Sequence, residues 1–594
     1  MRERIVIANA SGYWGDEAAA IKRQVLGGPI DYLTMDYLAE ITMIILAKQR
    51  ADSEDLGYAR DFVANLGRIL GEITERGIRV ICNAGGINPG ACARALSDEI
   101  ERQGLELPIA VVDGDDLMPR LGELVREGCE LPHIDTGEAL GERLDRVTSA
   151  NAYIGAQPIV AALDRGARVV ITGRTYDAAS VVAPMVYEFG WSWDDYDKLA
   201  SGLLAGHLIE CGAQATGGNY TLWREVSDYR NMGYPLVEVR ADGSFDLTKH
   251  PGTGGLVSTR TVIEQALYEI GDPTAYLSPD VAADFTTFSI TQSGSNRVSL
   301  TGVKGYAPPD SLKVSITYDV GFKVDASVVV SGPDCLAKAR RFAEIFWGRV
   351  GDDFLERRTD LLGYSACWGE SAAPEVEPNE VVLRFAASAA SPKPLQAMAR
   401  ELAGIALAGP AGICGAGGRP QVSKAFGFWP ALIPADRVTA RVSTRDGTTE
   451  LPCALPNNTK SRRAARKADL SGASPGLAAG PRQKVPLSRI SHSRSGDKGD
   501  TCNVGIAALR ADLYPELLRE VTAERVAEFF ASNVKGPVTR YRLDNLNALN
   551  FVMRSALGGG GTRSLMLDNQ GKTIGQALLT MEVEVSQALL EEDL

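Results

Sequence analysis

The chain repeats one local pattern, in which an apolar strand leads into a polar, glycine-containing loop and then a helix. Residues 4–8, 79–82, 108–112 and 168–172 are short apolar runs of this kind. Strands that alternate with helices pair in parallel and have both faces of the sheet covered. The pattern therefore predicts an α/β fold with a mostly parallel sheet and helices on both faces.

The helical segments between these strands show apolar periodicity. We expect helices over residues 17–26 and 37–48, and one helix over 58–75 with a buried stripe. Gly77 is placed to end that last helix. The stripe recurs every three or four residues, at Phe62, Leu66, Ile69, Leu70 and Ile73.

Residues 1–456 are expected to form the α/β domain, with an α+β subdomain over about 285–455. The subdomain should contain two alternating strands, SLKVSITYDV and FKVDASVVV, with elements predicted over 333–347 (helix), 380–385 (strand) and 395–407 (helix). Residues 457–483 are basic and then rich in small residues, which is typical of a solvated linker. Residues 484–594 should form a small α+β domain with an amphipathic helix over 515–530.

Charge and composition exclude several classes of partner. The 594 residues carry a net charge of -13, which disfavours nucleic acid and anionic membranes as partners. No apolar run approaches the roughly 18 residues of a membrane span, and no signal peptide precedes the first strand, so we expect a cytoplasmic protein. The 9 cysteines are scattered without CxxC spacing, which favours reduced thiols. Outside the run of small residues in the expected linker (SGASPGLAAG), the chain has no GxSxG match, and it has no full dinucleotide fingerprint after the first strand, which disfavours lipase-type and NAD-dependent chemistry.

The stretch RVICNAGGINPGACARAL (79–96) has the features of an anion site. A strand leads into a turn that contains Asn83, Gly85, Gly86 and Asn88, and Pro89 then opens a helix. Glycines allow close approach of a ligand, and the free N–H groups of a first helical turn attract anions. Alternatively, the two asparagines only satisfy the backbone of the turn.

Other polar residues also follow strand ends. Ligands of such sheets bind beyond the carboxyl ends of the strands, so these side chains should converge on one rim. Asp16 is either a helix N-cap or a site carboxylate. Arg174 either pairs with Asp177 or binds a carboxylate or thioester-phosphate group. The polar residues that follow strand ends, and that should converge on this rim, are Asp16, Asn83, Asn88, Asp113, Asp116, Arg174 and Asp177.

A glycine-rich segment over 195–220 brings His207, Glu210 and Cys211 within one helical turn, and Asn219 follows. His207 is either a structural histidine or, oriented by Glu210, an acid/base with a pKa near neutrality. Cys211 is a possible nucleophile, but nothing in the sequence lowers its pKa, which favours a structural thiol. Asn219 is a candidate for substrate binding.

The motif HSRSGDKGDTCN (492–503) is dense in polar groups, and it is either a solvated hairpin tip or part of a site. Arg494 and Lys498 would contact an anion, with Asn503 beside them. Asp497 and Asp500 would act as acid/base groups, or as ligands of magnesium, although their spacing matches no recognised metal cage.

Two sets of motifs resemble a known family. ANASGYWGD, NAGGINPGACA and LIECGAQATGGNY resemble the N-terminal domain of the acyclic terpene utilisation proteins, AtuA. SHSRSGDKGDTCNVGIAA and ALNFVMRSALGGGGTRSL resemble the AtuA-like ferredoxin-fold domain found at their C-terminus. The resemblance implies catabolism of acyclic terpenoid or branched acids, handled as CoA thioesters.

Two functional hypotheses follow. The first is a lyase or hydratase that adds or removes water or cleaves a carbon–carbon bond, with Asp16, His207, Glu210, Asp497 or Asp500 moving the proton. The second is a non-catalytic acyl-CoA-binding or assembly partner of other catabolic enzymes. No metal or separate cofactor is implied, and coenzyme A would enter as part of the substrate. Exposed sheet edges favour a homo-oligomer.

Overall fold

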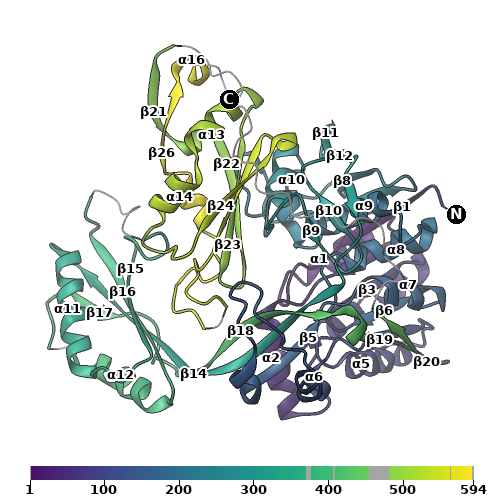
Figure 1. Cartoon of the computed structure of the whole chain (residues 1–594), viewed down its shortest axis with the longest axis horizontal. Coiled ribbons are helices and arrows are strands. Elements are labelled where there is room, and N and C mark those ends of the chain that lie inside the picture. The colour runs from purple at the N-terminus through teal and green to yellow at the C-terminus, as the bar shows by residue number, and fades with distance from the viewer. Residues whose placement is uncertain (1, 370–375, 406–407, 454–479, 562, 592–594) are drawn as a thin grey trace.

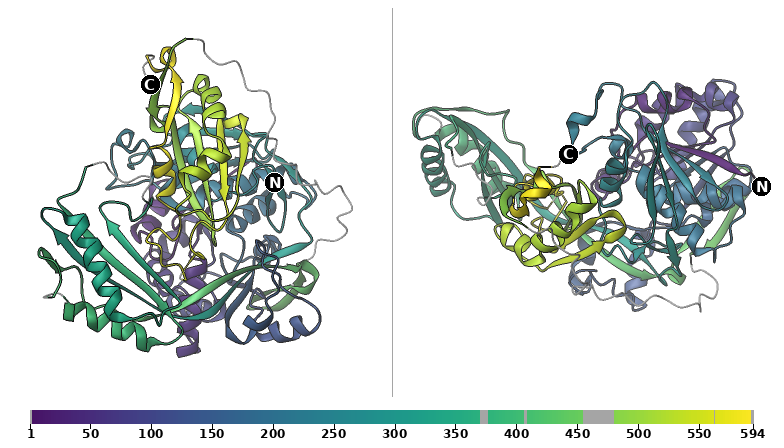
Figure 2. Two further views of the ribbon diagram at one scale, coloured as in Figure 1. Left: turned by 60° about the vertical axis from the view of Figure 1, so that its left-hand side comes forward. Right: turned by 90° about the horizontal axis from the view of Figure 1, so that it is seen from above.

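The computed structural model describes residues 2–369, 376–405, 408–453, 480–561 and 563–591. Figure 1 shows an α/β domain on the right, a distal lobe on the lower left and the C-terminal domain above and between them. Seen from above, the C-terminal domain lies between the other two parts (Figure 2). Among the described residues, no helix is long and apolar enough to cross a membrane.

An 11-stranded sheet forms the centre of the α/β domain. Its middle strands are parallel, as predicted, and run in the order β1 (Arg4–Asn9), β2 (Tyr32–Met35), β3 (Arg79–Cys82), β6 (Val169–Thr172) and β4 (Ile109–Asp113). Antiparallel strands extend the sheet beyond β1 and β4. They are β7 (Pro235–Arg240), β8 (Phe245–Lys249), β12 (Arg297–Thr301) and β11 (Ser289–Gly294) on one side, and β19 (Thr439–Thr444) and β20 (Gly447–Pro452) on the other.

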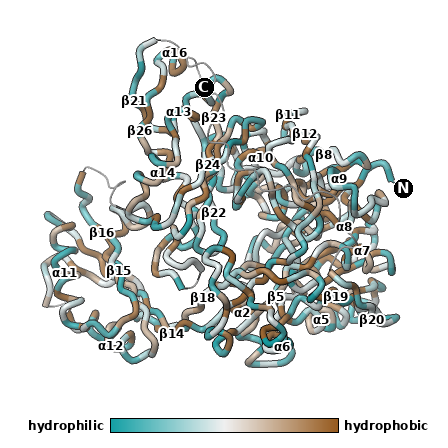
Figure 3. Tube along the Cα trace, viewed as in Figure 1, coloured by the Kyte–Doolittle hydropathy of each residue, from teal (hydrophilic) through white to brown (hydrophobic). Residues whose placement is uncertain are grey.

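Helices cover both faces of this sheet, as predicted, and the hydrophobic segments run through the interior of the domain (Figure 3). One face packs against α1 (Ala19–Gly27), α2 (Glu40–Asp52), α3 (Arg60–Gly67), α4 (Leu70–Arg76) and α5 (Pro89–Arg102). The other face packs against α7 (Gln157–Asp164), α8 (Ala179–Phe189) and α9 (Tyr196–Ile209). Each fully buried Ile or Phe in these layers stabilises the fold by roughly 1.5–3 kcal/mol.

The single helix expected over 58–75 is instead two helices, α3 and α4. The backbone of Ile69 leaves the helical region, with φ -136 and ψ 13, and this ends the first helix. The predicted apolar stripe is nevertheless buried in both helices. Gly77 ends α4 in the left-handed conformation, with φ 70, as expected.

A second sheet is built on β14 (Ser311–Ser331), one strand of 21 residues where two strands were expected. A register shift between Asp319 and Gly321 lets the strand bend without ending. Its partners are β5 (Val147–Ala152), β18 (Ser423–Pro434), β16 (Glu380–Ala389) and β17 (Ile413–Gly415), and β15 (Glu356–Leu362) pairs with β16. The ribbon of β14 and β18 joins the α/β domain to the distal lobe (Figure 1).

The distal lobe contains the helices α11 (Cys335–Val350) and α12 (Pro392–Ile405), which confirm the two helices predicted there. The range 285–455 contributes to both sheets, because β11, β12, β19 and β20 belong to the large one. Smaller elements of the remaining chain are β9 (Tyr276–Leu277), β10 (Ala282–Asp284), β13 (Lys304–Tyr306) and α6 (Leu121–Arg126).

The C-terminal domain has a four-stranded antiparallel sheet, in the order β22 (Ser491–Lys498), β23 (Thr501–Ala508), β25 (Ala548–Met553), β24 (Val538–Leu543). A separate pair is formed by β21 (Arg482–Pro486) and β26 (Glu582–Ser586). The helix expected over 515–530 is two helices, α13 (Tyr514–Glu520) and α14 (Ala523–Phe529), because Thr522 caps the second one. The short helices α15 (Ile574–Leu578) and α16 (Gln587–Leu590) follow.

Most of the expected linker, residues 457–479, lies outside the described residues.

A buried polar network attaches the C-terminal domain to α10 (Thr259–Ala266) and the segment after it. Glu264 is fully buried; His492 Nδ1 lies 3.0 Å from its Oε1, and Arg494 Nη2 lies 3.3 Å from its Oε2. Asn503 Nδ2 donates to Leu267 O at 2.8 Å. Breaking one partner of a buried ion pair leaves an uncompensated charge, so this network holds the two domains in one arrangement.

We therefore expect Glu264→Ala to lower the apparent free energy of unfolding by about 3–5 kcal/mol, because Arg494 stays buried without its carboxylate. The matched control is Glu344→Ala, since Glu344 pairs with Arg341 at the surface and both side chains are largely exposed. The control should change stability little. Urea unfolding of both variants measures the difference, and equal losses would contradict the role of the network.

Candidate functional site

A cavity of about 640 Å³ lies where the carboxyl ends of β1, β2 and β6 meet the tip of the C-terminal hairpin. The parts of the chain that line it include the loops after the parallel strands, the start of α2, the segments after α9 and α10, the β14 ribbon and the C-terminal domain. Its charged lining residues are Asp16, Asp36, Glu40, Arg174, Asp177, Glu210, Glu269, Lys313, Asp497, Lys498 and Lys572. The predicted convergence of strand-end residues on one rim is therefore seen for Asp16, Arg174 and Asp177.

Arg174 is buried, and both terminal nitrogens of its guanidinium contact protein groups. Its Nη1 donates to Leu38 O at 2.6 Å, and its Nη2 donates to Tyr153 OH at 2.9 Å. The guanidinium also stacks over the Tyr153 ring, 4.3 Å from the centroid, and its Nη2 lies 3.3 Å from Asp177 Oδ1. The pairing with Asp177 expected as one alternative is thus present, and the pair faces the cavity.

Asp36 directly follows β2 and is held by two donors. Asn83 Nδ2 donates to Asp36 Oδ1 at 2.7 Å, and Leu38 N donates to the same oxygen at 2.9 Å. Burial and the neighbouring Asp177 raise the pKa of Asp36 to about 8, although Arg174 and Asn83 oppose the shift. Asn83 thus acts by positioning an acidic group that keeps its proton at neutral pH.

Glu210 is a second acid with a perturbed pKa. Burial and Asp177 raise the pKa of its carboxyl well above the usual range. His207 Nδ1 lies 3.5 Å from Glu210 Oε1, but burial lowers the pKa of His207 to about 4. The structural alternative for His207 therefore fits better than the acid/base one: its ring packs against the stacked rings of Tyr276 and Phe285 and carries no charge at pH 7.

Cys211 lines the cavity beside Glu210. Burial and the Glu210 carboxyl raise the pKa of its thiol well above the usual value. A thiol that holds its proton is a weak nucleophile, which agrees with the structural role favoured from the sequence.

Two lysines form the opposite wall around Glu269. Lys498 Nζ lies 2.8 Å from Glu269 Oε2, and Lys572 Nζ lies 3.0 Å from Glu269 Oε1. Despite burial, these two ammonium groups lower the pKa of Glu269 far below its usual range. Lys572 Nζ also lies 3.1 Å from Asp497 Oδ1, and burial together with Glu269 raises the pKa of Asp497 to about 7.

The lysine wall depends on a close approach between domains. A Cβ at Gly496 would lie 2.6 Å from the ring of Tyr268 and 2.7 Å from the side chain of Glu269. Only glycine therefore lets β22 pack against these residues. Glu269 itself has φ 53, which is a left-handed backbone conformation that residues other than glycine rarely adopt.

Lys313 of β14 also lines the cavity, where it contacts Glu40 and Tyr153. Its Nζ lies 3.8 Å from Glu40 Oε1 and 4.7 Å from the centroid of the Tyr153 ring. Although burial opposes ionisation, Lys313 and Arg174 lower the pKa of Glu40. The cavity thus combines protonated acids on one side with ammonium groups on the other.

The glycine turn after β3 does not line the cavity. Asn88 caps α5 by accepting from Ala91 N at 3.3 Å, and its Nδ2 donates to Glu54 O and Leu56 O at 2.8 Å. A Cβ on Gly86 would lie 2.3 Å from Leu46 Cδ1, and one on Gly85 would lie 2.5 Å from Thr172 O. The anion-site interpretation of this turn is therefore a misreading, because protein atoms already fill the space that a ligand would need.

Asp16 and Asn219 both line the cavity. Asp16 is not the N-cap of α1, which is Ala18. It accepts instead from Gly12 N at 2.8 Å, Glu17 N at 2.7 Å and Tyr234 OH at 2.5 Å. These donors fix the loop after β1, so Asp16 shapes the rim of the cavity.

The motif 492–503 divides between the cavity and the domain interface. Asp497 and Lys498 reach the cavity, whereas Arg494 and Asn503 belong to the buried interface. Asp500 accepts from Leu557 N at 3.0 Å and Gly559 N at 2.8 Å, so it anchors a loop of its own domain. Within the described residues, no group of three or more His, Cys, Asp or Glu side chains is arranged to hold a metal ion.

Several cavity residues were not predicted from the sequence. Asp36 follows a strand end, so the rule applied to Asp16 and Arg174 would have found it. Glu40, Glu269, Lys313 and Lys572 have no comparable local signal, because they reach the cavity only through long-range packing.

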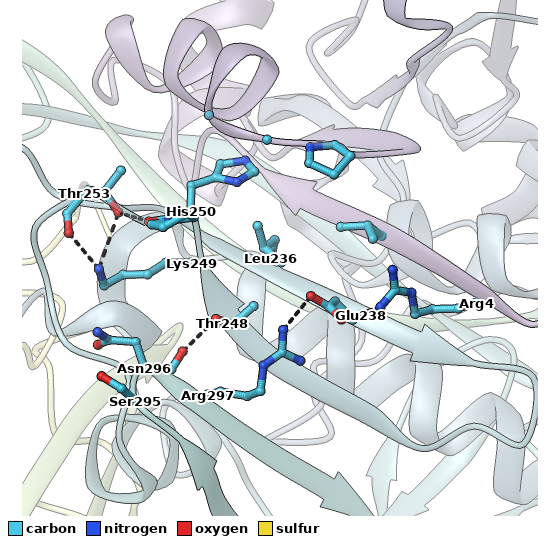
Figure 4. A pocket seen from close by; sticks show the side chains of 16 residues that line it. Arg4, Leu236, Glu238, Thr248, Lys249, His250, Thr253, Ser295, Asn296 and Arg297 are labelled. Carbon is cyan, nitrogen blue, oxygen red and sulfur yellow. Dashed lines mark hydrogen bonds and ion pairs between the residues drawn. The ribbon is translucent and has the colours of Figure 1, made fainter.

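A separate cavity of about 660 Å³ lies beside the antiparallel strands β7, β8 and β12 (Figure 4). Its arginines are already paired: Arg4 and Arg297 contact Glu238 at 3.0 and 2.6 Å. Lys249 Nζ donates to Thr253 O at 2.7 Å. Glu238 is the only acidic residue among those that line this cavity, and both arginines engage it, so the cavity lacks the cluster of carboxyl groups found at the sheet rim.

Comparison with known proteins agrees with this architecture. Residues 5–444 match the acyclic terpene utilisation family protein AtuA, and residues 485–584 match the AtuA ferredoxin-like domain. The chain therefore belongs to the AtuA family, which implies a role in acyclic terpene utilisation. No curated protein and no solved structure matches the chain.

The raised pKa of Asp36 predicts a pH-dependent stability. Between pH 3.8 and about 8 the folded protein holds a proton that the unfolded chain has released, so stability falls as pH rises through this window. Asp36→Asn removes this titration and should be more stable than wild type at pH 8 by at least about 1 kcal/mol. The difference should vanish near pH 4. Urea unfolding at pH 4, 6 and 8 tests this, and parallel pH profiles would contradict it.

Proposed function

We propose that the protein is an enzyme that performs acid–base chemistry on acyclic terpenoid or branched-chain acids, as free acids or acyl-CoA thioesters. The reaction classes are hydration or dehydration and carbon–carbon cleavage next to a carbonyl. The observation that carries this proposal is one cavity in which carboxyl groups with raised pKa values face lysine ammonium groups.

The acid side of the cavity supplies proton donors. A carboxyl group with a pKa near or above 7 keeps its proton at neutral pH and can give it to a leaving hydroxyl. Asp36 meets this condition with a pKa of about 8, and the pKa of Glu210 is raised in the same direction; the two share the neighbour Asp177, which together with burial raises both pKa values. Asp177 beside Arg174 is then the acceptor on the same rim.

The lysine side supplies charge for the substrate's carbonyl or carboxylate. In our proposal Lys498 and Lys313 hold the carbonyl oxygen, and they stabilise the negative charge that develops when the adjacent carbon loses its proton. In dehydration, Asp177 takes that proton, the β-carbon–oxygen bond breaks, and Asp36 or Glu210 protonates the departing hydroxyl to give water. The reverse order adds water, so both directions use the same groups.

Removing a proton donor should lower turnover far more than binding. We expect Asp36→Asn and Glu210→Gln each to lower kcat by about 10²–10⁴-fold on any substrate that wild type converts. The matched control is Asp280→Asn, because Asp280 is a buried acid whose pKa burial raises to about 6 but which does not line the cavity. Mass spectrometry of branched 3-hydroxyacyl-CoA and enoyl-CoA panels provides the measurement.

Removing a lysine should act first on substrate binding. Lys498→Met is expected to weaken binding of a branched acid about tenfold or more, through loss of a charged hydrogen bond. The control is Lys424→Met, because Lys424 forms an ion pair with Asp319 outside the cavity. Tight binding that requires Lys498, together with no turnover across both panels, would favour the non-catalytic acyl-CoA-binding role over catalysis.

A further inference from the structure

A second, more apolar cavity of about 440 Å³ adjoins the polar one. The two cavities share the lining residues Tyr153, Asp177, Glu269, Lys313 and Lys498. A molecule held at these shared lysines therefore has a polar space on one side and an apolar space on the other. We call the second space the apolar arm, which is lined by residues of the segments 275–279 and 428–432 and of the C-terminal domain.

Unusually exposed side chains mark the arm. Ile134, Leu277 and Leu432 line it with exposed fractions of 45%, 62% and 44%. Clustered apolar side chains in contact with water mark ligand grooves or protein contacts. Here the cluster continues into the polar cavity, which favours a small amphipathic ligand as the occupant.

Two charged residues that line the apolar arm, Arg554 and Asp272, already contact other protein groups. Its rim arginine, Arg554, pairs with Asp135 at 2.7 Å. Asp272 accepts from Thr274 N at 2.9 Å. Apart from these charged groups, the charged residues that it shares with the polar cavity and a few hydroxyl groups, the arm is lined by aliphatic side chains, prolines and aromatic rings, which suit a hydrocarbon chain.

We propose that the apolar arm binds the branched hydrocarbon chain of the substrate, while Lys313 and Lys498 at the junction hold its carboxylate or thioester carbonyl. This inference rests on the proposed function and adds the direction in which the substrate lies. Leu432 is opposite Lys313 in the pairing of β18 with β14, so chain contact and head-group contact come from neighbouring strands. In this proposal, the ribbon of β14 and β18 sets the preference of the site for the length of the hydrocarbon chain.

The test compares two saturated acids with the same head group, 3-methylbutanoic acid and 3,7-dimethyloctanoic acid, by titration calorimetry. Wild type should bind the longer acid at least about tenfold more tightly, since burial of even two methylene groups corresponds to that ratio. Leu277→Asp should remove this preference and leave the affinity for the shorter acid unchanged. Leu277 is exposed, so the variant is expected to fold. Leu432→Asp should also remove the preference, but its carboxylate lies opposite Lys313 and should weaken binding of both acids.

The matched control is Leu355→Asp, because Leu355 is 65% exposed and does not line the arm. It should keep the full preference for the longer acid. Equal affinity of wild type for both acids, no binding of either acid, or an equal loss for both acids in Leu277→Asp would overturn the inference.

Turnover of the corresponding 3-hydroxyacyl-CoA and enoyl-CoA thioesters separates this inference from the proposed function. A chain-length preference that Leu432→Asp removes, without turnover of any thioester, supports the arm and counts against catalysis. Turnover that is independent of chain length supports catalysis and overturns the arm.

Discussion

The buried contact between the C-terminal domain and residues 264–271 is the constraint on which the site depends. Glu264 with Arg494 and His492 is stable only as a complete set, because each charge would be costly to bury alone. This set fixes β22 so that Lys498 lies against Glu269. The lysine wall of the cavity therefore exists only while the two domains are docked.

Under the proposed function, the separation of charge in the cavity would serve proton transfer. Carboxyl groups crowd around Arg174 and hold protons, because burial and mutual repulsion disfavour a second negative charge. On the other wall Glu269 is ionised between Lys498 and Lys572. Keeping acids neutral beside fixed cations lowers the stability of the fold. Groups with strongly shifted pKa values cluster at the functional sites of proteins.

Three parts of the chain that are far apart in sequence meet at this site. The α/β domain contributes the acids, the C-terminal domain contributes lysines, and the ribbon of β14 and β18 contributes Lys313 and the wall of the apolar arm (Figure 1). Membership in the AtuA family fits a ligand that is polar at one end and hydrocarbon at the other. The distal lobe is thereby connected to the site through the two strands of this ribbon.

The sequence alone determined the parallel strands, most helices, the family and the strand-end residues Arg174 and Asp177, because apolar periodicity and loop position are local properties. It did not determine that Asn88 only caps a helix or that His207 is uncharged, since both depend on what packs around them. Nothing in the sequence indicated that Glu269, Lys313 and Lys572 line the cavity. Only the tertiary structure decided which charges meet, because burial and long-range contacts set both their distances and their pKa values.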